Sequence, residues 1–276
     1  MMRFSRPAEP PGFSKRAKDI RATIAAMVLA GKAPASSDFK NVWGSFKDTL
    51  VAAQHGRCGY CDALVAHIGY GDVEHFRPKS AVQEVSDPDA LGACARDEAP
   101  TVKIFSHSGY ALLAYDWNNY LFSCERCNQQ YKRCLFPLAT RSSAAPSDGQ
   151  GEVPLLLHCY GPDEPADHLE FDEIGFVKPV RGSQHGYETI VTVGLGRSTL
   201  TLARRDKTER IHLMVRRLND KMKAGGDWVG VLRDLVIECD AARPFGGVAR
   251  VIVQQQLKLT WPEIEALAAP HAGQTP

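Results

Sequence analysis

Two matched cysteine motifs constrain this chain more than any other feature: Cys58 pairs with Cys61 in one C-x-x-C turn, and Cys124 pairs with Cys127 in another. Such a turn lets two sulfur atoms reach one metal ion, and two turns supply the four thiolates of a tetrahedral Zn²⁺ site. The pairs are further apart than in a compact zinc ribbon, so two alternatives stay open. One is a thioredoxin-like redox motif, which the absence of a clear βαβ pattern disfavours, and the other is coincidence. The pattern favours structural zinc.

The other four of the eight cysteines are isolated, and no role is predicted for Cys94, Cys134, Cys159 and Cys239. Free cysteines commonly behave as small buried apolar residues. The first residues lack the apolar stretch of a secretory signal, and no apolar run approaches the roughly 20 residues of a membrane helix. We therefore expect a cytoplasmic chain without a membrane span, in which thiols stay reduced.

Charge is balanced overall but uneven along the chain. Lys and Arg number 33 and Asp and Glu 32, so no global basic excess indicates nucleic acid. Residues 197–223 and 1–40 are locally basic, and both segments could face an acidic ligand. The alternative for each segment alone is a solvated helix face with a local bias. The 44% hydrophobic content excludes a wholly disordered chain.

The apolar periodicity predicts an α+β fold in three parts. An N-terminal helical segment covers 1–54, with helices over 14–31 and 38–54. A central core covers 55–137, with short strands or loop–strand pieces at 57–66 and 71–77, a helix over 124–133, and a polar, irregular insertion at 80–114. A mainly helical region covers 153–276, with a strand at 154–159 and a hairpin over 169–179. Its expected helices cover 197–223, 228–239, 245–257 and 261–267.

Chemistry-bearing residues lie between the cysteine pairs, in V-E-H-F-R-P-K at 73–79. Glu74 and His75 are adjacent, so on a strand they point to opposite faces. A carboxylate is a hard ligand suited to Mg²⁺ or Mn²⁺, and a neutral imidazole can take a proton from water. Arg77 and Lys79 could contact phosphate. Taken alone, the motif is also compatible with a buried histidine beside a surface glutamate.

A second group of polar residues surrounds the second cysteine pair. Asn128 directly follows Cys127, and its amide oxygen is a further hard ligand. Lys132 lies one helical turn later on the same face. Asn119 could join two loop segments through its side-chain amide, although an isolated Asn is usually a turn residue. Chance seldom produces this ordered set together with the cysteine pairs.

The set resembles the HNH endonuclease family, whose core is a ββα-metal fold. The resemblance implies that Glu74 is a catalytic-metal ligand, His75 the general base, and Asn119 the residue that orients the histidine-bearing loop. It also implies that Asn128 is the second metal ligand, in place of a histidine. The zinc ligands would be Cys58, Cys61, Cys124 and Cys127. The expected fold is thus an HNH core with structural zinc, between N-terminal helices and a mainly helical C-terminal region.

A finer resemblance is to PtuB-like HNH proteins of Septu and retron anti-phage systems. It covers E-H-F-R-P-K, G-Y-A-L-L-A-Y-D-W-N-N-Y-L and C-N-Q-Q-Y-K, and more loosely H-L-E-F-D-E-I-G and E-T-I-V-T-V-G-L-G-R. The sequence departs from that pattern where P-L-L-L-H-C lacks Asn-Pro and where G-L-G-R replaces G-L-N-R. The resemblance implies a PtuA-like ATPase partner and, in retron systems, a reverse transcriptase with its attached DNA. No Walker-type motif occurs here, so an ATPase must be another chain.

The resulting hypothesis is a Mg²⁺- or Mn²⁺-dependent endonuclease that hydrolyses phosphodiester bonds in nucleic acid, with DNA favoured over RNA. Arg77, Lys79 and Lys132 are its predicted phosphate contacts. The alternative is a zinc-stapled subunit that binds nucleic acid or docks a partner without cleaving. That alternative does not need Glu74, His75 and Asn128 together, so the sequence favours the enzyme.

Overall fold

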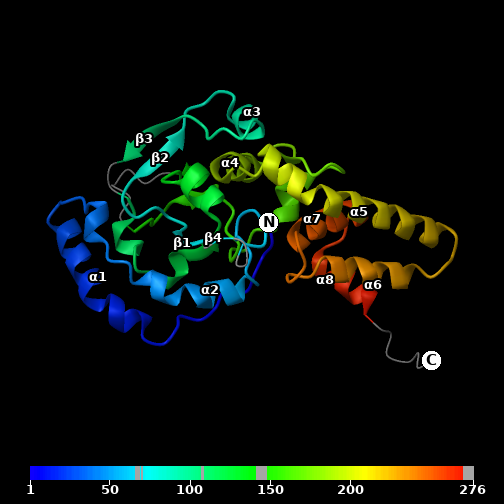
Figure 1. Ribbon diagram of the computed structural model, residues 1–276, viewed down its shortest axis with the longest axis horizontal. Helices are drawn as coiled ribbons and strands as arrows, with labels where there is room; N and C mark the ends of the chain where they lie inside the picture. Colours follow the sequence, from blue (N-terminus) through cyan, green and yellow to red (C-terminus); the bar gives the residue numbers. More distant parts are fainter. Residues whose placement is uncertain (66–68, 70, 107–108, 141–147, 270–276) are drawn as a thin grey trace.

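The computed structural model describes residues 1–65, 69, 71–106, 109–140 and 148–269. The chain has a mixed α+β fold, and in the described part its strands form four two-stranded sheets. Figure 1 shows the small β1–β4 sheet beside the N-terminal helices α1 and α2, with the C-terminal helices α5 to α8 gathered on the other side. The predicted α+β class is confirmed at this level.

The central unit runs strand, strand, helix. Strand β1 (Asp72–His75) pairs antiparallel with β4 (Tyr120–Ser123), and the π-type helix η5 (Arg126–Lys132) follows. All four residues of β4 are buried. Of the two forms predicted for 57–66, the described part has the loop form, because the first cysteine pair turns the chain there and leaves an isolated bridge between Arg57 and Leu64.

The N-terminal segment forms α1 (Phe13–Leu29) and α2 (Lys47–Ala53). The single helix predicted over 38–54 is broken into η1 (Ser36–Asp38), η2 (Trp43–Phe46) and α2. The Asn41 side chain accepts a hydrogen bond of 2.9 Å from the Gly44 amide and so makes a local turn. The Phe46 ring then packs edge-on against Phe13. The local turn at Asn41 and the packing of Phe46 outweigh the apolar periodicity that predicted one continuous helix.

The insertion is more regular than predicted. It contains β2 (Val82–Val85), α3 (Ala90–Ala95) and β3 (Val102–Ser106), with β2 and β3 paired antiparallel. The Gln83 amide donates to the Cys134 carbonyl at 2.8 Å, and the Phe136 amide donates to the Gln83 carbonyl at 3.2 Å. These bonds attach the insertion to the segment that follows η5.

The structure confirms most of the elements expected in the C-terminal region. The hairpin is β7 (Leu169–Phe171) with β8 (Val177–Pro179). The four expected helices are α5 (Ser198–Lys223), α6 (Trp228–Glu238), α7 (Gly246–Leu257) and α8 (Trp261–Ala268). The strand expected at 154–159 shrinks to β6 (Val153–Pro154), paired with β5 (Leu138–Thr140). Short 3₁₀ helices are η3 (Ala111–Leu113), η4 (Trp117–Asn119) and η6 (Pro165–Asp167).

One helix, α4 (Gln184–Val193), was not among the predicted elements. Its T-I-V-T-V run is rich in β-branched residues, which favour strands. The helix forms because the Ser183 hydroxyl caps it, accepting 3.0 Å from the Gly186 amide, and because Gly194 ends it at φ +64°.

Apolar packing joins the central unit to the C-terminal helices. A single buried cluster contains Leu121 and Phe122 of β4 together with Val215 of α5 and Val253 of α7. A second, smaller cluster lies under α1 and includes Ala17, Ile24 and Tyr115. Among the described residues, every helix is too short or too polar to cross a lipid bilayer.

Candidate active site and metal centre

Strand pairing brings the two cysteine pairs together. Cys58 and Cys61 precede β1, whereas Cys124 and Cys127 follow β4, and the antiparallel β1–β4 register makes these chain segments neighbours. The four sulfur atoms all lie within 4.8 Å of one another, and 3.9 Å separates those of Cys61 and Cys124. Bonds of about 2.3 Å in a tetrahedral zinc site place sulfurs about 3.8 Å apart. The four cysteines could therefore hold a zinc ion, as the sequence predicts.

The thiolate cluster is enclosed and supplied with hydrogen-bond donors. Cys58, Cys61 and Cys127 are buried and Cys124 is half-buried. The Cys127 amide donates to the Cys124 sulfur at 3.4 Å, and the Ser123 hydroxyl lies 3.5 Å from the Cys58 sulfur. Donors of this kind stabilise thiolate ligands and fix their orientation.

Glu74 is buried on β1 and faces η5. The ammonium of Lys132, itself fully buried, lies 2.5 Å from one Glu74 carboxylate oxygen and donates to the His75 carbonyl at 3.0 Å. Burial raises the pKa of Glu74, and the charge of Lys132 opposes that rise. Lys132 therefore neutralises Glu74 inside the protein, whereas a phosphate contact would need it to face solvent.

His75 points to the opposite face of β1, as strand geometry requires. Its ring meets the Trp43 and Tyr120 rings edge-to-face, with centroids 4.6 and 5.0 Å away. Its Nε2 lies 3.0 Å from the Ala114 carbonyl, which fixes the proton on Nε2 and leaves the Nδ1 lone pair free of that bond. Burial lowers the pKa of His75 well below its usual value, and the charge of Lys79 lowers it further. The imidazole is thus neutral at pH 7.

Asn119 joins two chain segments through its amide. Its Oδ1 accepts from the Arg77 amide at 2.7 Å, and its Nδ2 donates to the carbonyls of Arg77 and Leu113 at 3.0 and 3.1 Å. The side chain is 5% exposed. Asn119 thereby fixes the chain directly after His75, which is the geometry expected of a residue that orients the histidine-bearing segment.

The other two predicted phosphate contacts are also engaged within the protein. Arg77 forms an ion pair of 2.7 Å with the buried Glu152 and lies over the Tyr110 ring. The Lys79 ammonium lies 5.1 Å from the centre of the Trp43 ring, and burial lowers the pKa of Lys79. Both cations lie beside the strand that bears Glu74 and His75, but neither is a freely exposed charge.

Helix η5 contacts β1 through the side chains of Gln129 and Lys132. The Gln129 side chain donates to Asp72 at 2.6 Å, and Lys132 reaches Glu74 on the same strand. Asn128 is half-buried on the same helix, directly after the second cysteine pair. The donor types of Glu74 and Asn128 suit Mg²⁺ or Mn²⁺. A cation at Glu74 would have to displace or share the place of the Lys132 ammonium.

Sequence reasoning missed the residues that enclose His75. Trp43 packs on its ring, and Tyr120 donates a hydrogen bond of 2.5 Å to the same Ala114 carbonyl that His75 contacts. Glu152, the partner of Arg77, was also missed. The only signal was the aromatic content of 39–46 and 110–122, which says nothing about which ring meets which histidine.

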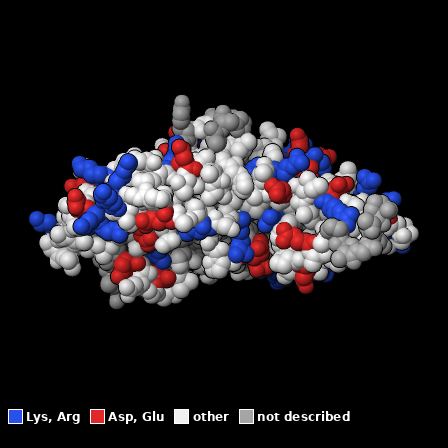
Figure 2. Space-filling view, turned by 90° about the horizontal axis from the view of Figure 1, so that it is seen from below, with Lys and Arg blue, Asp and Glu red and all other residues white. Residues whose placement is uncertain are grey.

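Charge on one face of the molecule is mixed. Figure 2 shows Lys and Arg side chains interspersed with Asp and Glu across the face seen from below, without one continuous basic surface on that face. On α5, the exposed cations Arg210 and Arg216 are paired with Glu238 and Glu173. The local basic excess of 197–223 is thus partly neutralised in the fold.

Comparison with known proteins gives one informative match. No protein-family model matches the chain. The Septu protein PtuB of Bacillus mycoides (strain KBAB4) is 34% identical over 172 residues, which are 61% of this chain and 52% of that protein. The match therefore spans about half the length of this relative. It confirms the predicted PtuB-type resemblance.

Proposed function

We propose that this chain is a metal-dependent HNH endonuclease that hydrolyses phosphodiester bonds in nucleic acid, with DNA favoured over RNA, and that it acts as the effector nuclease of an anti-phage defence system. The observation that supports this most is the joint placement of His75, Glu74 and Asn119 on one strand–strand–helix unit whose ends carry the thiolate cluster. Similarity to a Septu PtuB protein supports the defence role.

In this proposal His75 is the general base. Its Nε2 proton is committed to the Ala114 carbonyl, so Nδ1 is the atom that would accept a proton from the attacking water. The lowered pKa of His75 keeps the ring neutral at pH 7, as a base must be. Asn119 holds the segment after His75 and so limits its movement relative to a bound phosphate.

Glu74 and Asn128 are the proposed ligands of a catalytic Mg²⁺ or Mn²⁺ ion. When bound, such an ion supplies Lewis-acid stabilisation of charge at the phosphate. The charge of Lys132 opposes the rise that burial causes in the pKa of Glu74, and its ammonium holds the carboxylate in place. Arg77 and Lys79 border this strand and are the proposed phosphate contacts, each after exchanging its present partner for the substrate.

The proposed partner is a PtuA-like ATPase on a separate chain, with a retron reverse transcriptase and its attached DNA as a further partner in retron systems. The printed name of the relative, Septu protein PtuB, supports a defence context. Co-purification of a neighbour-encoded ATPase would distinguish a complex subunit from a free-standing nuclease. The competing function is a zinc-stapled subunit that binds nucleic acid or a partner without cleaving. The internal ion pairs of Arg77 and Lys132 favour its partner-binding form, because they leave fewer charges for nucleic acid.

The test compares plasmid DNA and RNA incubated with the zinc-loaded full chain, alone and with the ATPase, in Mg²⁺ or Mn²⁺ and with a chelator. We expect metal-dependent nicking that Glu74→Gln removes and that Glu170→Gln, a partly exposed control on β7, leaves unchanged. Binding of nucleic acid without cleavage under every one of these conditions would establish the competing function instead.

A further inference from the structure

We propose that Arg197 is a positioning residue of the thiolate cluster: it donates a charged hydrogen bond to the Cys127 sulfur and joins the C-terminal helices to the zinc centre. The Arg197 Nη1 atom lies 3.5 Å from the Cys127 sulfur. The arginine is 4% exposed and the cysteine is fully buried. The contact links residues 70 positions apart in the sequence.

The end of α4 fixes the guanidinium in this place. Arg197 Nη1 also donates to the Gly194 carbonyl at 2.7 Å and lies 3.4 Å from that of Val193. Gly194 allows the approach, because a Cβ there would meet the Tyr131 ring of η5 at 2.4 Å. The positive φ of Gly194 and its lack of a side chain together allow the end of α4 to pack against η5. Arg197 is therefore oriented by backbone carbonyls rather than by a mobile carboxylate.

The positive charge of Arg197 would compensate the negative charge of a zinc-bound thiolate cluster. Four thiolates around Zn²⁺ carry a net charge of −2, and a buried charge is costly unless it is compensated. The Cys127 amide is a neutral donor to the Cys124 sulfur, whereas the Ser123 hydroxyl donates to the Cys124 carbonyl and lies 3.5 Å from the Cys58 sulfur. Among the donors placed near the sulfurs in the described part of the chain, Arg197 brings a full positive charge, and charge-assisted bonds are about twice as strong as neutral ones.

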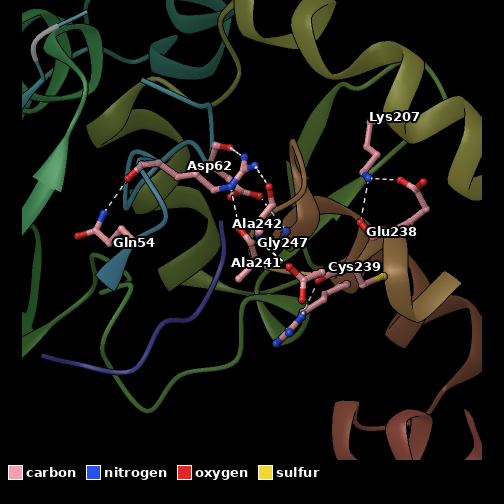
Figure 3. A network of polar contacts seen from close by, with 11 residues as sticks. Gln54, Asp62, Lys207, Glu238, Cys239, Ala241, Ala242 and Gly247 are labelled. Atoms are coloured by element: carbon pink, nitrogen blue, oxygen red, sulfur yellow. Dashed lines mark hydrogen bonds and ion pairs between the residues drawn. The ribbon is translucent and has the colours of Figure 1, made fainter. Parts of the chain in front are cut away.

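The first cysteine pair is attached to the C-terminal region by an independent set of bonds. Arg57, directly before Cys58, donates to the carbonyls of Ala241 and Ala242 at 2.8 and 3.0 Å. Asp62, directly after Cys61, accepts from the Gly247 amide at 2.8 Å. Figure 3 shows Asp62, Ala241, Ala242 and Gly247 meeting in this network. The C-terminal region thus contacts Cys127 directly and the first cysteine pair through the residues that flank it, which a zinc site serving only the central unit would not require.

The test measures the metal centre itself in the full-length chain, so it does not depend on cleavage. Arg197→Met removes the charge and keeps the bulk, Arg197→Gln keeps neutral N–H donors, and Arg205→Met is the exposed control on α5. Zinc release to a competing chelator and the thiolate-to-metal absorption of the Co²⁺-substituted protein are recorded for each variant. Outer contacts of metal sites typically contribute 10- to 100-fold in metal affinity.

We expect both Arg197 variants to release zinc at least 10-fold more readily and to shift the Co²⁺–thiolate absorption, with Arg205→Met matching the wild type. If Arg197→Met fails to fold, Arg197→Gln decides the question by the same two readouts. Folded Arg197 variants with wild-type zinc release and an unchanged Co²⁺ spectrum would overturn the proposal. A chain that cleaves no nucleic acid but shows the expected zinc loss would refute the proposed function and leave this inference standing.

Discussion

The thiolate cluster and the Glu74–His75 strand are neighbours along the chain, yet their polar groups are satisfied in different ways. The four sulfurs of the cluster converge on one point and are surrounded by donors, which suits an incoming cation. On the strand, Glu74 is already paired with Lys132, and His75 is bonded to a carbonyl and covered by aromatic rings. The difference indicates that the cluster could hold a metal ion in its present arrangement, whereas the catalysis proposed for the strand requires an exchange of partners.

The largest effect should follow from removing one zinc ligand. Cys124→Ser leaves three thiolates, and structural zinc contributes about 10–16 kcal/mol in zinc-finger peptides, comparable to the whole stability of a domain. We expect loss of bound zinc and of the cooperative melting transition, measured by metal analysis and circular dichroism. Cys134→Ser is the matched control outside the cluster and should keep both. A Cys124→Ser chain that melts like the wild type would refute the structural-metal assignment.

A smaller but still large effect is expected from breaking the buried ion pair on the strand. Lys132→Met leaves the Glu74 carboxylate without its counter-ion and should cost about 3–5 kcal/mol at pH 7, measured by urea unfolding. The loss should shrink as the pH falls, because protonation removes the unpaired charge. The double variant Glu74→Gln with Lys132→Met should recover much of the stability. Equal stability of Lys132→Met and the wild type would show that the pair is not formed.

The side-chain amide of Asn119 should contribute less than this ion pair to the free energy of unfolding. Asn119→Ala removes three hydrogen bonds and leaves the Arg77 amide without its partner, which should cost about 1–3 kcal/mol. The neighbouring Asn118 is exposed, so Asn118→Ala should change the free energy of unfolding by less than about 0.5 kcal/mol. Indistinguishable unfolding curves for these two variants would contradict the role given to Asn119.

The last effect is similar in size to that of Asn119 but arises only on acidification, and it concerns His158, which packs on Phe76 directly after the strand. Burial, with the charge of Arg6, lowers the pKa of His158 to about 3. Its folded pKa lies below the unfolded value of about 6.5, so its neutral form supports the fold above pH 6.5 and stability falls as the pH drops toward 3. Between pH 6.5 and 5 this loss is about 2 kcal/mol.

His158→Gln should lack that part of the pH dependence. Urea unfolding of the wild type and the variant at pH 6.5 and pH 5 measures it as a double difference, from which other titrating groups cancel. A double difference near zero would mean that the pKa of His158 is the same in the folded and the unfolded chain, which would contradict its lowering by burial.

Sequence alone predicted the parts of the site that depend on short motifs. The cysteine pairs and the Asn119 amide are recognisable because a few neighbouring residues define their geometry. The pairing of Lys132 with Glu74 was not predicted, because it depends on how η5 lies along β1. The contact of Trp43 with His75 was not predicted, because the helix expected around Trp43 is broken by Asn41 and Gly44. Helix α4 was missed because a serine cap and Gly194 override its β-branched composition.

The measurement that tests the account most directly is cleavage of nucleic acid by His75→Ala, with bound zinc determined on the same preparation. If the cluster is structural and the strand is catalytic, the variant keeps one zinc ion per chain and a cooperative melting transition but loses cleavage by at least about 100-fold. Cleavage by His75→Ala at the wild-type rate, with zinc bound in both proteins, would contradict the central claim.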